Sequence, residues 1–142
     1  MHDIKGFFGP YRWLSNFADC KIVLNDLEFP STENAYQAAK FLAAGDFAVP
    51  HLLTKCSAKE AKAMGAKAPL VSDWNEFKIV IMTEVIDQKF NQSPYKELLL
   101  STGNCYIEET NTWNDTFWGV CNGRGENNLG KLIMKKRENL HG

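Results

Sequence analysis

The alternation of apolar and polar positions near the start of the chain predicts a β-hairpin. Residues 20–24 and 27–29 are two short apolar, β-prone runs on either side of Asn25-Asp26. Asn and Asp tolerate the left-handed backbone of a tight two-residue turn, so we expect the two runs to pair as neighbouring strands. Pro30 is expected to end the second strand, because proline cannot donate to a sheet ladder.

Helix start and stop signals follow directly after this hairpin. Ser31 is expected to be the N-cap of a helix that runs to about Ala44, with Gly45 just beyond its end. Capping and stop residues of the same kinds predict four further helices, over residues 58–65, 74–90, 94–102 and 128–139. One strand is expected at residues 105–110, where apolar and polar side chains alternate.

The longest predicted helix opens at Asp73, with Glu76 three residues later. Apolar residues recur along it at helical spacing and form one stripe, namely Trp74, Phe77, Ile81 and Val85. Further apolar residues widen this arc, so we expect the helix to be central and mostly buried. Together the elements predict a mostly helical α+β fold with a small antiparallel β component.

Length and composition fit one globular domain over residues 1–142. The chain has 44% apolar and 12% aromatic residues, which is enough for a hydrophobic core. Its net charge of −1 gives no general electrostatic attraction to nucleic acids, so a nucleic-acid substrate would be engaged locally. The N-terminus lacks the apolar core of a signal peptide, and no run of 18 apolar residues is present. We therefore expect a cytoplasmic protein without a membrane partner, and the sequence assigns no oligomeric state.

The sequence indicates no metal site and no cofactor. The four cysteines lie far apart with no C-x-x-C pair, and the three histidines are scattered. No G-x-S-x-G motif is present, and the glycine spacing fits neither a dinucleotide fingerprint nor a P-loop. Chemistry is therefore expected from carboxylates, amides, amines and aromatic side chains.

One polar face of the first predicted helix is a candidate for chemistry. Glu33, Tyr36, Gln37 and Lys40 fall within an arc of about 80° at 100° per residue, with small apolar residues opposite. A carboxylate, a phenol, an amide and an amine on one face can line a polar cleft. Two other interpretations stay open, because an acid in a first helical turn is favoured by the helix dipole and a solvated face has the same pattern.

A second candidate lies in the aromatic and glycine-rich stretch 113–130. Asp115 stands between Trp113 and Trp118, and apolar walls around a carboxyl raise its pKa and suit it to general acid catalysis. The alternative is a structural Asx-type turn. The glycines after Trp118 would let the backbone and the start of the last helix approach a phosphate. The candidate binding residues of this stretch are Trp118, Gly119, Arg124 and Asn128.

Two polar residues stand out in the aromatic N-terminal segment 6–17. Arg12 and Asn16 are expected to contact phosphate or ribose, whereas the aromatic residues around them are expected to anchor the segment. Trp74, at the start of the longest helix, has two interpretations: a core residue, or a surface on which a base stacks.

Several separated segments together resemble the YbiA-like, or NADAR, family. The likeness rests on segments 14–17, 29–41 and 114–119 with 125–134, and it is extended by 74–76, 89–90 and 98–103. Asn34 departs from the pattern, since the family commonly has histidine after the glutamate. The resemblance implies that Glu33, Trp74 and Asp115 are functional positions and that Lys40 is the motif lysine, which engages an opened ribose as an imine or holds a phosphate.

The same resemblance implies an N-glycosidase that cleaves the bond between ribose C1 and a nitrogen. The expected substrate is a small-molecule or nucleobase-linked ribosyl compound: a phosphoribosylamino-pyrimidine intermediate of riboflavin synthesis, an ADP-ribosyl-guanine, or ADP-ribosylated nucleic acid. A module that binds ADP-ribose or NAD without cleaving it is the alternative. A purely structural domain is a third interpretation, in which the polar arc is solvated surface.

Overall fold

The structure is a computed structural model that describes residues 2–141. The chain forms two compact units, which are described one at a time. The middle unit is the continuous segment Asn16–Lys89. The terminal unit combines the residues up to Ser15 with those from Phe90 onward.

The middle unit begins with the predicted hairpin. Strands β2 (Asp19–Leu24) and β3 (Leu27–Ser31) pair antiparallel. The turn residues Asn25 and Asp26 have φ angles of 51° and 62°, the left-handed conformation that these residue types accommodate. Pro30 lies inside β3 instead of ending it, so the prediction was wrong by one residue.

Helix α1 (Thr32–Ala43) starts where β3 ends, as the capping pattern predicts. The Ser31 hydroxyl accepts a hydrogen bond from the backbone N–H of Asn34 at 3.0 Å, which satisfies a donor that the helix itself leaves open. Gly45 follows the helix with a φ of 84°, a value that glycine adopts without steric cost. The direct step from strand to helix fixes which residues form the first turn of α1.

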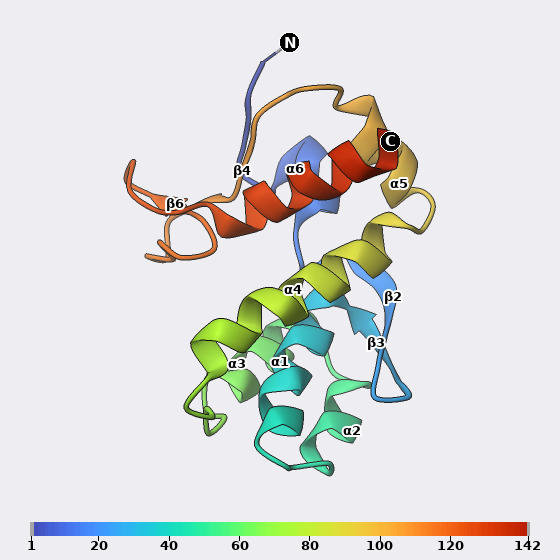
Figure 1. The fold of residues 1–142 in the computed structure, drawn as a ribbon, viewed down its shortest axis with the longest axis vertical. Helices are drawn as coiled ribbons and strands as arrows, with labels where there is room; N and C mark the ends of the chain where they lie inside the picture. The colour runs from blue at the N-terminus through green and yellow to red at the C-terminus, as the bar shows by residue number, and fades with distance from the viewer. Residues whose placement is uncertain (1, 142) are drawn as a thin grey trace. The chain divides into compact units, whose positions relative to one another are not determined.

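Two short helices pack against α1 in the same unit (Figure 1). Helix α3 (Ala58–Gly65) has the predicted capping box, in which Ser57 and Glu60 each accept from the other's backbone N–H at 3.1 Å. Helix α2 (Val49–Leu53) was not predicted. Its first turn is held by Asp46, whose Oδ1 accepts from two backbone N–H groups.

The longest helix, α4 (Trp74–Phe90), is buried along one face only. Its fully or nearly buried residues are Trp74, Met82, Val85, Ile86, Lys89 and Phe90. Phe77 and Val80 are 40% and 60% exposed, so the prediction of a mostly buried helix was wrong for that face. Apolar residues lie all around this helix in the sequence, and apolar periodicity alone therefore does not identify the packed side.

Short parallel strand pairs form the β structure of the terminal unit. Strand β1 (Ile4–Lys5) pairs with β4 (Ile107–Glu108), and β5 (Thr110–Asn111) pairs with β6 (Val120–Cys121). The single strand predicted at 105–110 is therefore two strands with different partners. Among the strand pairs of residues 2–141, the β2–β3 hairpin is the antiparallel one that was predicted. The terminal unit adds an isolated antiparallel bridge between Cys121 and Arg124.

The remaining elements of the terminal unit are helical. A 3₁₀ segment, η1 (Gly9–Leu14), follows β1, and α5 (Tyr95–Ser101) starts one residue later than predicted, since Pro94 is its N-cap rather than its first residue. Gly103 ends α5 with a φ of 60°. Helix α6 (Asn128–His141) extends past its predicted end and packs against β4 and α5 (Figure 1).

The predicted α+β class is confirmed, with helices as the main element in both units. Among residues 2–141, none of the helices has the length and apolar content that crossing a membrane requires.

We predict that Ser31→Ala lowers the free energy of unfolding by about 1–2 kcal/mol, because it removes the side-chain cap of α1. Ser72→Ala, at an exposed position, is the matched control and should change it by less than about 0.5 kcal/mol. Urea unfolding of both variants measures the difference. Equal stability of the two variants would show that α1 does not depend on its cap.

Candidate active site

The first turns of α1 are buried although they are rich in polar residues. All residues from 31 to 39 are buried, with Glu33 at 8% and Gln37 at 5% exposure. The interpretation of this face as solvated surface is therefore wrong. Buried polar groups need partners, because an unpaired one costs free energy on leaving water.

Glu33 and Gln37 bond to each other one turn apart. The Gln37 Nε2 donates to the Glu33 Oε2 at 2.5 Å. The backbone N–H of Glu33 donates to the carbonyl of Asn16 at 3.0 Å, which fixes the first turn in which the carboxylate stands. The carboxylate is thus held in place by the helix itself and by the segment that precedes the hairpin.

The other polar atom of Gln37 stands out because it is left without a partner. Within the described residues, the Gln37 Oε1 is the buried side-chain oxygen or nitrogen that makes no hydrogen bond. It lies against Gly65 at the end of α3, where an added Cβ would come within 1.7 Å of this oxygen. Only glycine lets α3 approach so closely, and the Gln37 Oε1 stays a buried, unpaired acceptor beside a buried carboxylate.

Lys40 lies one turn further along α1 and is half-buried. Its Nζ donates to the carbonyl of Gly65 at 3.4 Å and stands 5.6 Å from the centre of the Tyr36 ring. Burial lowers the pKa of Lys40 and nearby Lys78 lowers it further, while Glu33 acts in the opposite direction. A lysine with a lowered pKa has a larger neutral fraction and is a better nucleophile than an exposed one.

Aromatic rings pack beside this group. Trp74 is 4% exposed and its ring centre lies 5.8 Å from that of Tyr36, at an interplanar angle of 53°. Phe77 packs edge-on against Trp74 at 6.3 Å. The core interpretation of Trp74 thus fits its burial, and Tyr36 bridges Trp74 and Lys40.

Asn16 has its side chain occupied by structural contacts. Its Oδ1 accepts from the Thr32 hydroxyl at 2.9 Å, and its Nδ2 donates to the Met82 sulfur at 3.7 Å. It therefore ties the start of α1 to α4. The predicted phosphate or ribose contact would have to displace these bonds.

Asp115, the second predicted carboxylate, belongs to the terminal unit and organises a turn. Its Oδ1 accepts from the backbone N–H groups of Phe117 and Trp118 at 3.1 and 2.9 Å. The side chain of Asn111 accepts from the N–H of Asp115 and donates to its carbonyl, at 3.1 and 2.9 Å. Asp115 thus forms the Asx-type turn that was the alternative prediction. Among residues 2–141, hydrogen bonds engage only the Oδ1 atom of its carboxylate.

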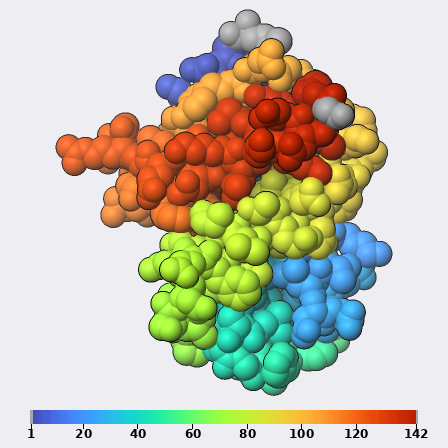
Figure 2. Space-filling model, viewed as in Figure 1, coloured from blue at the N-terminus to red at the C-terminus, as the bar shows by residue number. Residues whose placement is uncertain are grey.

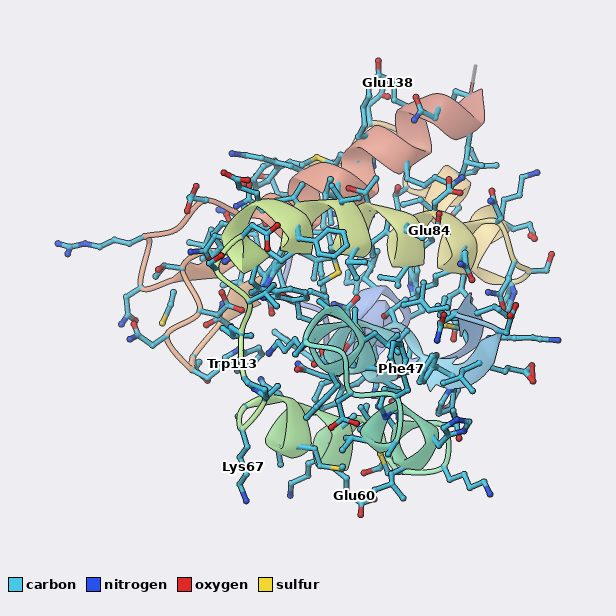
Figure 3. The ribbon with its side chains drawn as sticks, turned by 60° about the horizontal axis from the view of Figure 1, so that its bottom comes forward. Phe47, Glu60, Lys67, Glu84, Trp113 and Glu138 are labelled. Atoms are coloured by element: carbon cyan, nitrogen blue, oxygen red, sulfur yellow. The ribbon has the colours of Figure 1, made fainter. Side chains whose placement is uncertain are left out.

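The expected apolar enclosure of Asp115 is incomplete. Trp113, labelled in Figure 3, is 58% exposed and does not wall the carboxyl off from water. Trp118 is half-buried and packs edge-on against Phe117, with 4.8 Å between ring centres.

Gly119 lies in close contact with neighbouring residues, whereas Gly123 has open space around it. A Cβ on Gly119 would come within 1.9 Å of the Glu109 carboxylate, itself 8% exposed, and within 2.1 Å of the Glu109 carbonyl. The Asn111 Nδ2 also donates to this carboxylate, at 3.0 Å. The space beside Gly119 is thus filled by a buried acid, while the prediction that the glycines of this loop admit a phosphate stays untested.

Donor groups at the start of α6 also form hydrogen bonds within the protein. Asn128 donates to the carbonyl of Phe117 through its backbone N–H at 3.2 Å and through its side chain at 3.0 Å. The N–H of Leu129 donates to the carbonyl of Trp118 at 2.9 Å. These groups hold the loop, and the predicted phosphate contact at this helix start stays a prediction.

The two arginines that were predicted to bind substrate, Arg12 and Arg124, are both exposed. Arg12 lies in η1, and Arg124 lies in the turn that follows β6. Figure 2 shows this turn projecting from the surface of the terminal unit. Within the described residues neither arginine forms an ion pair with a carboxylate, so both remain available to anions.

The predicted site residues thus form two groups. The middle unit brings together Glu33, Tyr36, Gln37, Lys40, Trp74 and Asn16, whereas the terminal unit contains Asp115, Trp118, Gly119, Asn128, Arg12 and Arg124. Sequence reasoning missed Gly65, Asn111 and Glu109, which contact these groups from other segments. In residues 2–141 no three His, Cys, Asp or Glu side chains are grouped so that they could hold a metal ion.

Comparison with known proteins defines the class. The model of the NADAR domain matches residues 6–141 and so spans both units. The chain therefore belongs to the NADAR domain family, as the sequence motifs indicate.

Individual proteins of this family are similar to the chain over most of its length. N-glycosidase Npun_R5314 of Nostoc punctiforme is 36% identical over 92% of this chain and 86% of its own length. N-glycosidase YbiA of Escherichia coli is 34% identical over 92% and 82%. The riboflavin biosynthesis protein VVA0006 of Vibrio vulnificus is 31% identical over 92% of this chain and 36% of that longer protein.

The solved structure of one of these relatives has a similar fold. The NMR structure of E. coli YbiA has a TM-score of 0.83 and 31% identity, covering 99% of this chain and 87% of that one. The prediction of an enzyme of the N-glycosidase class is confirmed at the level of the family by these names.

We predict that the stability difference between the wild type and Lys40→Met changes with pH. Because the folded-state pKa of Lys40 is lowered from 10.5, the unfolded state binds more protons at this position between the two values. Unfolding free energy of the wild type, relative to the variant, should therefore rise as the pH approaches 10.5 from below. Urea unfolding across this range measures it, and a difference that falls with pH would contradict the burial of Lys40.

Proposed function

We propose that this protein hydrolyses the bond between ribose C1 and a nitrogen in an ADP-ribosyl or phosphoribosyl N-glycoside. The substrates we consider are ADP-ribosyl-guanine and the phosphoribosylamino-pyrimidine intermediates of riboflavin synthesis. The names of the relatives support the reaction class, and the Vibrio protein's name supports the second substrate. The observation that carries the proposal is the buried Glu33, Gln37 and Lys40 group on α1.

The chemistry fits this group. Hydrolysis adds water to C1, breaks the bond from C1 to nitrogen, and returns a proton to the departing base. Glu33 is assigned the activation of water or of a ribose hydroxyl, because it is a positioned carboxylate in a partly dehydrated setting. The open Oε1 of Gln37 is suited to accept a bond from a ribose hydroxyl.

Lys40 is assigned a role as nucleophile. Its lowered pKa favours an imine with an opened ribose over a purely ionic hold on phosphate, since only a neutral amine adds to C1. In that route the Lys40 Nζ adds to C1 of the opened ribose, the bond from C1 to the base nitrogen breaks, and the departing base takes up the proton. Water then hydrolyses the imine, which releases the ribose and restores the free amine. The carbonyl of Gly65 and the ring of Tyr36 hold the Lys40 amine on the face of α1 that also carries Glu33.

We expect Glu33→Gln to lower turnover at least about 100-fold with little change in stability, because glutamine has the same shape and can still accept from Gln37. Release of free base from the two substrate classes, followed by chromatography, measures it. Glu60→Gln, on the exposed surface of α3, is the matched control and should keep wild-type activity. Full activity of Glu33→Gln would remove Glu33 from the mechanism.

Asp115 is tested by Asp115→Asn. This variant keeps the Oδ1 acceptor for Phe117 and Trp118, so the turn persists and only the charge is lost. If Asp115 donates a proton or orients the sugar, turnover should fall on the order of 100-fold. Unchanged turnover would leave Asp115 with its structural turn alone. Tight calorimetric binding of ADP-ribose by the wild type, with no turnover of either substrate, would instead favour the non-catalytic module.

A further inference from the structure

Glu109 is a buried acid of the terminal unit that the proposed reaction does not use. It lies between β4 and β5 and is 8% exposed. A carboxylate that leaves water costs free energy unless hydrogen bonds replace its hydration, so acids are rarely buried without partners. The partners of Glu109 therefore indicate its role.

The carboxylate of Glu109 fixes the orientation of the Asn111 side chain. The Nδ2 of Asn111, a residue that is 5% exposed, donates to the Glu109 Oε2 at 3.0 Å. A side-chain amide donates through its nitrogen and accepts through its oxygen, whereas an ionised carboxylate only accepts. Turning the amide by half a revolution would set the Asn111 Oδ1 against the carboxylate, with two acceptors facing each other. Glu109 thus selects one of the two orientations of this amide.

In the selected orientation, Asn111 bonds to both backbone groups of Asp115. Its Oδ1 accepts from the N–H of Asp115 at 3.1 Å, and its Nδ2 donates to the carbonyl of Asp115 at 2.9 Å. The reversed amide would lose both bonds, because a donor would face the N–H and an acceptor would face the carbonyl. The backbone at Asp115 is therefore held by an amide whose orientation depends on Glu109.

The segment that carries Asp115 depends on such contacts for its conformation. Residues 112–119 form neither helix nor strand, and Asn114 has a φ of 66°, a left-handed conformation that costs free energy in residues other than glycine. The Asp115 Oδ1 accepts from the N–H groups of Phe117 and Trp118. With the backbone and Oδ1 both held, the direction of the other carboxylate oxygen, Oδ2, is fixed as well.

Glu109 also contacts the far end of this loop. The N–H of Val120 donates to the carbonyl of Glu109 at 2.9 Å. An added Cβ on Gly119 would come within 1.9 Å of the Glu109 Oε2, so this approach requires glycine. Glu109 therefore holds the loop at its Asn111 end and at its Gly119 end.

We propose that Glu109 is a positioning residue for Asp115: its carboxylate orients the Asn111 amide, and this amide sets where the Asp115 carboxylate stands during the reaction. Glu109 itself touches no substrate atom. The inference rests on the proposed function, in which Asp115 orients the sugar or donates a proton to the departing base.

The test is Glu109→Gln, assayed by release of free base from the two substrate classes named above. Glutamine has the same shape, but it can present either an oxygen or an NH₂ group to Asn111, so the Asn111 amide loses its single orientation. The kcat should fall on the order of 10-fold, because the Asp115 carboxylate is displaced from its productive position. The KM should change by less than about 2-fold, because Glu109 does not bind the substrate.

The matched control is Glu108→Gln. Glu108 is 9% exposed and is thus about as buried as Glu109, but its carboxylate accepts from the hydroxyls of Tyr106 and Thr110. This control removes the same charge without touching Asn111 and should keep the wild-type kcat. Circular dichroism checks that both variants fold.

A double-mutant cycle separates positioning from general damage to the fold. In the Asp115→Asn background, Glu109→Gln should cause no further loss of kcat, since the group that it positions is already altered. A second readout needs no turnover. The backbone N–H of Asp115 should lose hydrogen-exchange protection in Glu109→Gln and keep it in Glu108→Gln.

Four results would each overturn the positioning role: wild-type kcat in Glu109→Gln, an equal loss in Glu108→Gln, losses that add in the double variant, or unchanged exchange at Asp115. If Asp115→Asn still lowers turnover in that case, the proposed function stands without Glu109. Wild-type turnover by Asp115→Asn alone would be a failure of the catalytic role of Asp115, and the positioning role would fall with it.

Discussion

Burial of polar groups at the start of α1 is the constraint on which the candidate active site depends. A carboxylate and an amide that leave water must be given partners, and here the partners come from the chain's own backbone and from each other. Ser31 caps the helix, Asn16 accepts from the N–H of Glu33, and Gln37 donates to its carboxylate. The strand β3 enters the helix without a loop, so Ser31, Glu33 and Gln37 lie on one continuous segment, to which Asn16 bonds from outside.

This constraint extends to neighbouring helices. Gly65 has no side chain because the Gln37 amide fills the space where a Cβ would stand. Its carbonyl then accepts from Lys40, whose burial lowers the pKa of its amine. The contact between α1 and α3 thus places an unpaired amide oxygen and a more nucleophilic amine on the helix that carries the Glu33 carboxylate. That combination suits attack at a ribose C1 and agrees with the family to which the chain belongs.

The sequence predicted those features that depend on local chemistry. The hairpin at Asn25-Asp26, the Ser31 cap and the Ser57 capping box each need only neighbouring residues, and all three are confirmed. Burial of the Glu33 face was not predictable, because periodicity defines a face but not what covers it. The contact of Gly65 with Gln37 was missed for the same reason.

The terminal unit shows a second limit of sequence reasoning. Its parallel strands pair residues as distant as Ile4 and Ile107, which no local pattern reveals. The sequence predicted Asp115 either as an acid catalyst or as the centre of an Asx-type turn. Its bonds to Phe117 and Trp118 form that turn, and the exposure of Trp113 shows that the flanking tryptophans do not enclose the carboxyl. Its catalytic role stays a prediction.

The most direct test of the account is a crystal structure with ADP-ribose bound. We predict that a Glu33 carboxylate oxygen lies within about 2.6–3.2 Å of a ribose hydroxyl or of a water facing C1, with the Gln37 Oε1 bonded to the sugar. Binding of ADP-ribose at a surface remote from α1, with Glu33 and Gln37 still closed on each other, would contradict it.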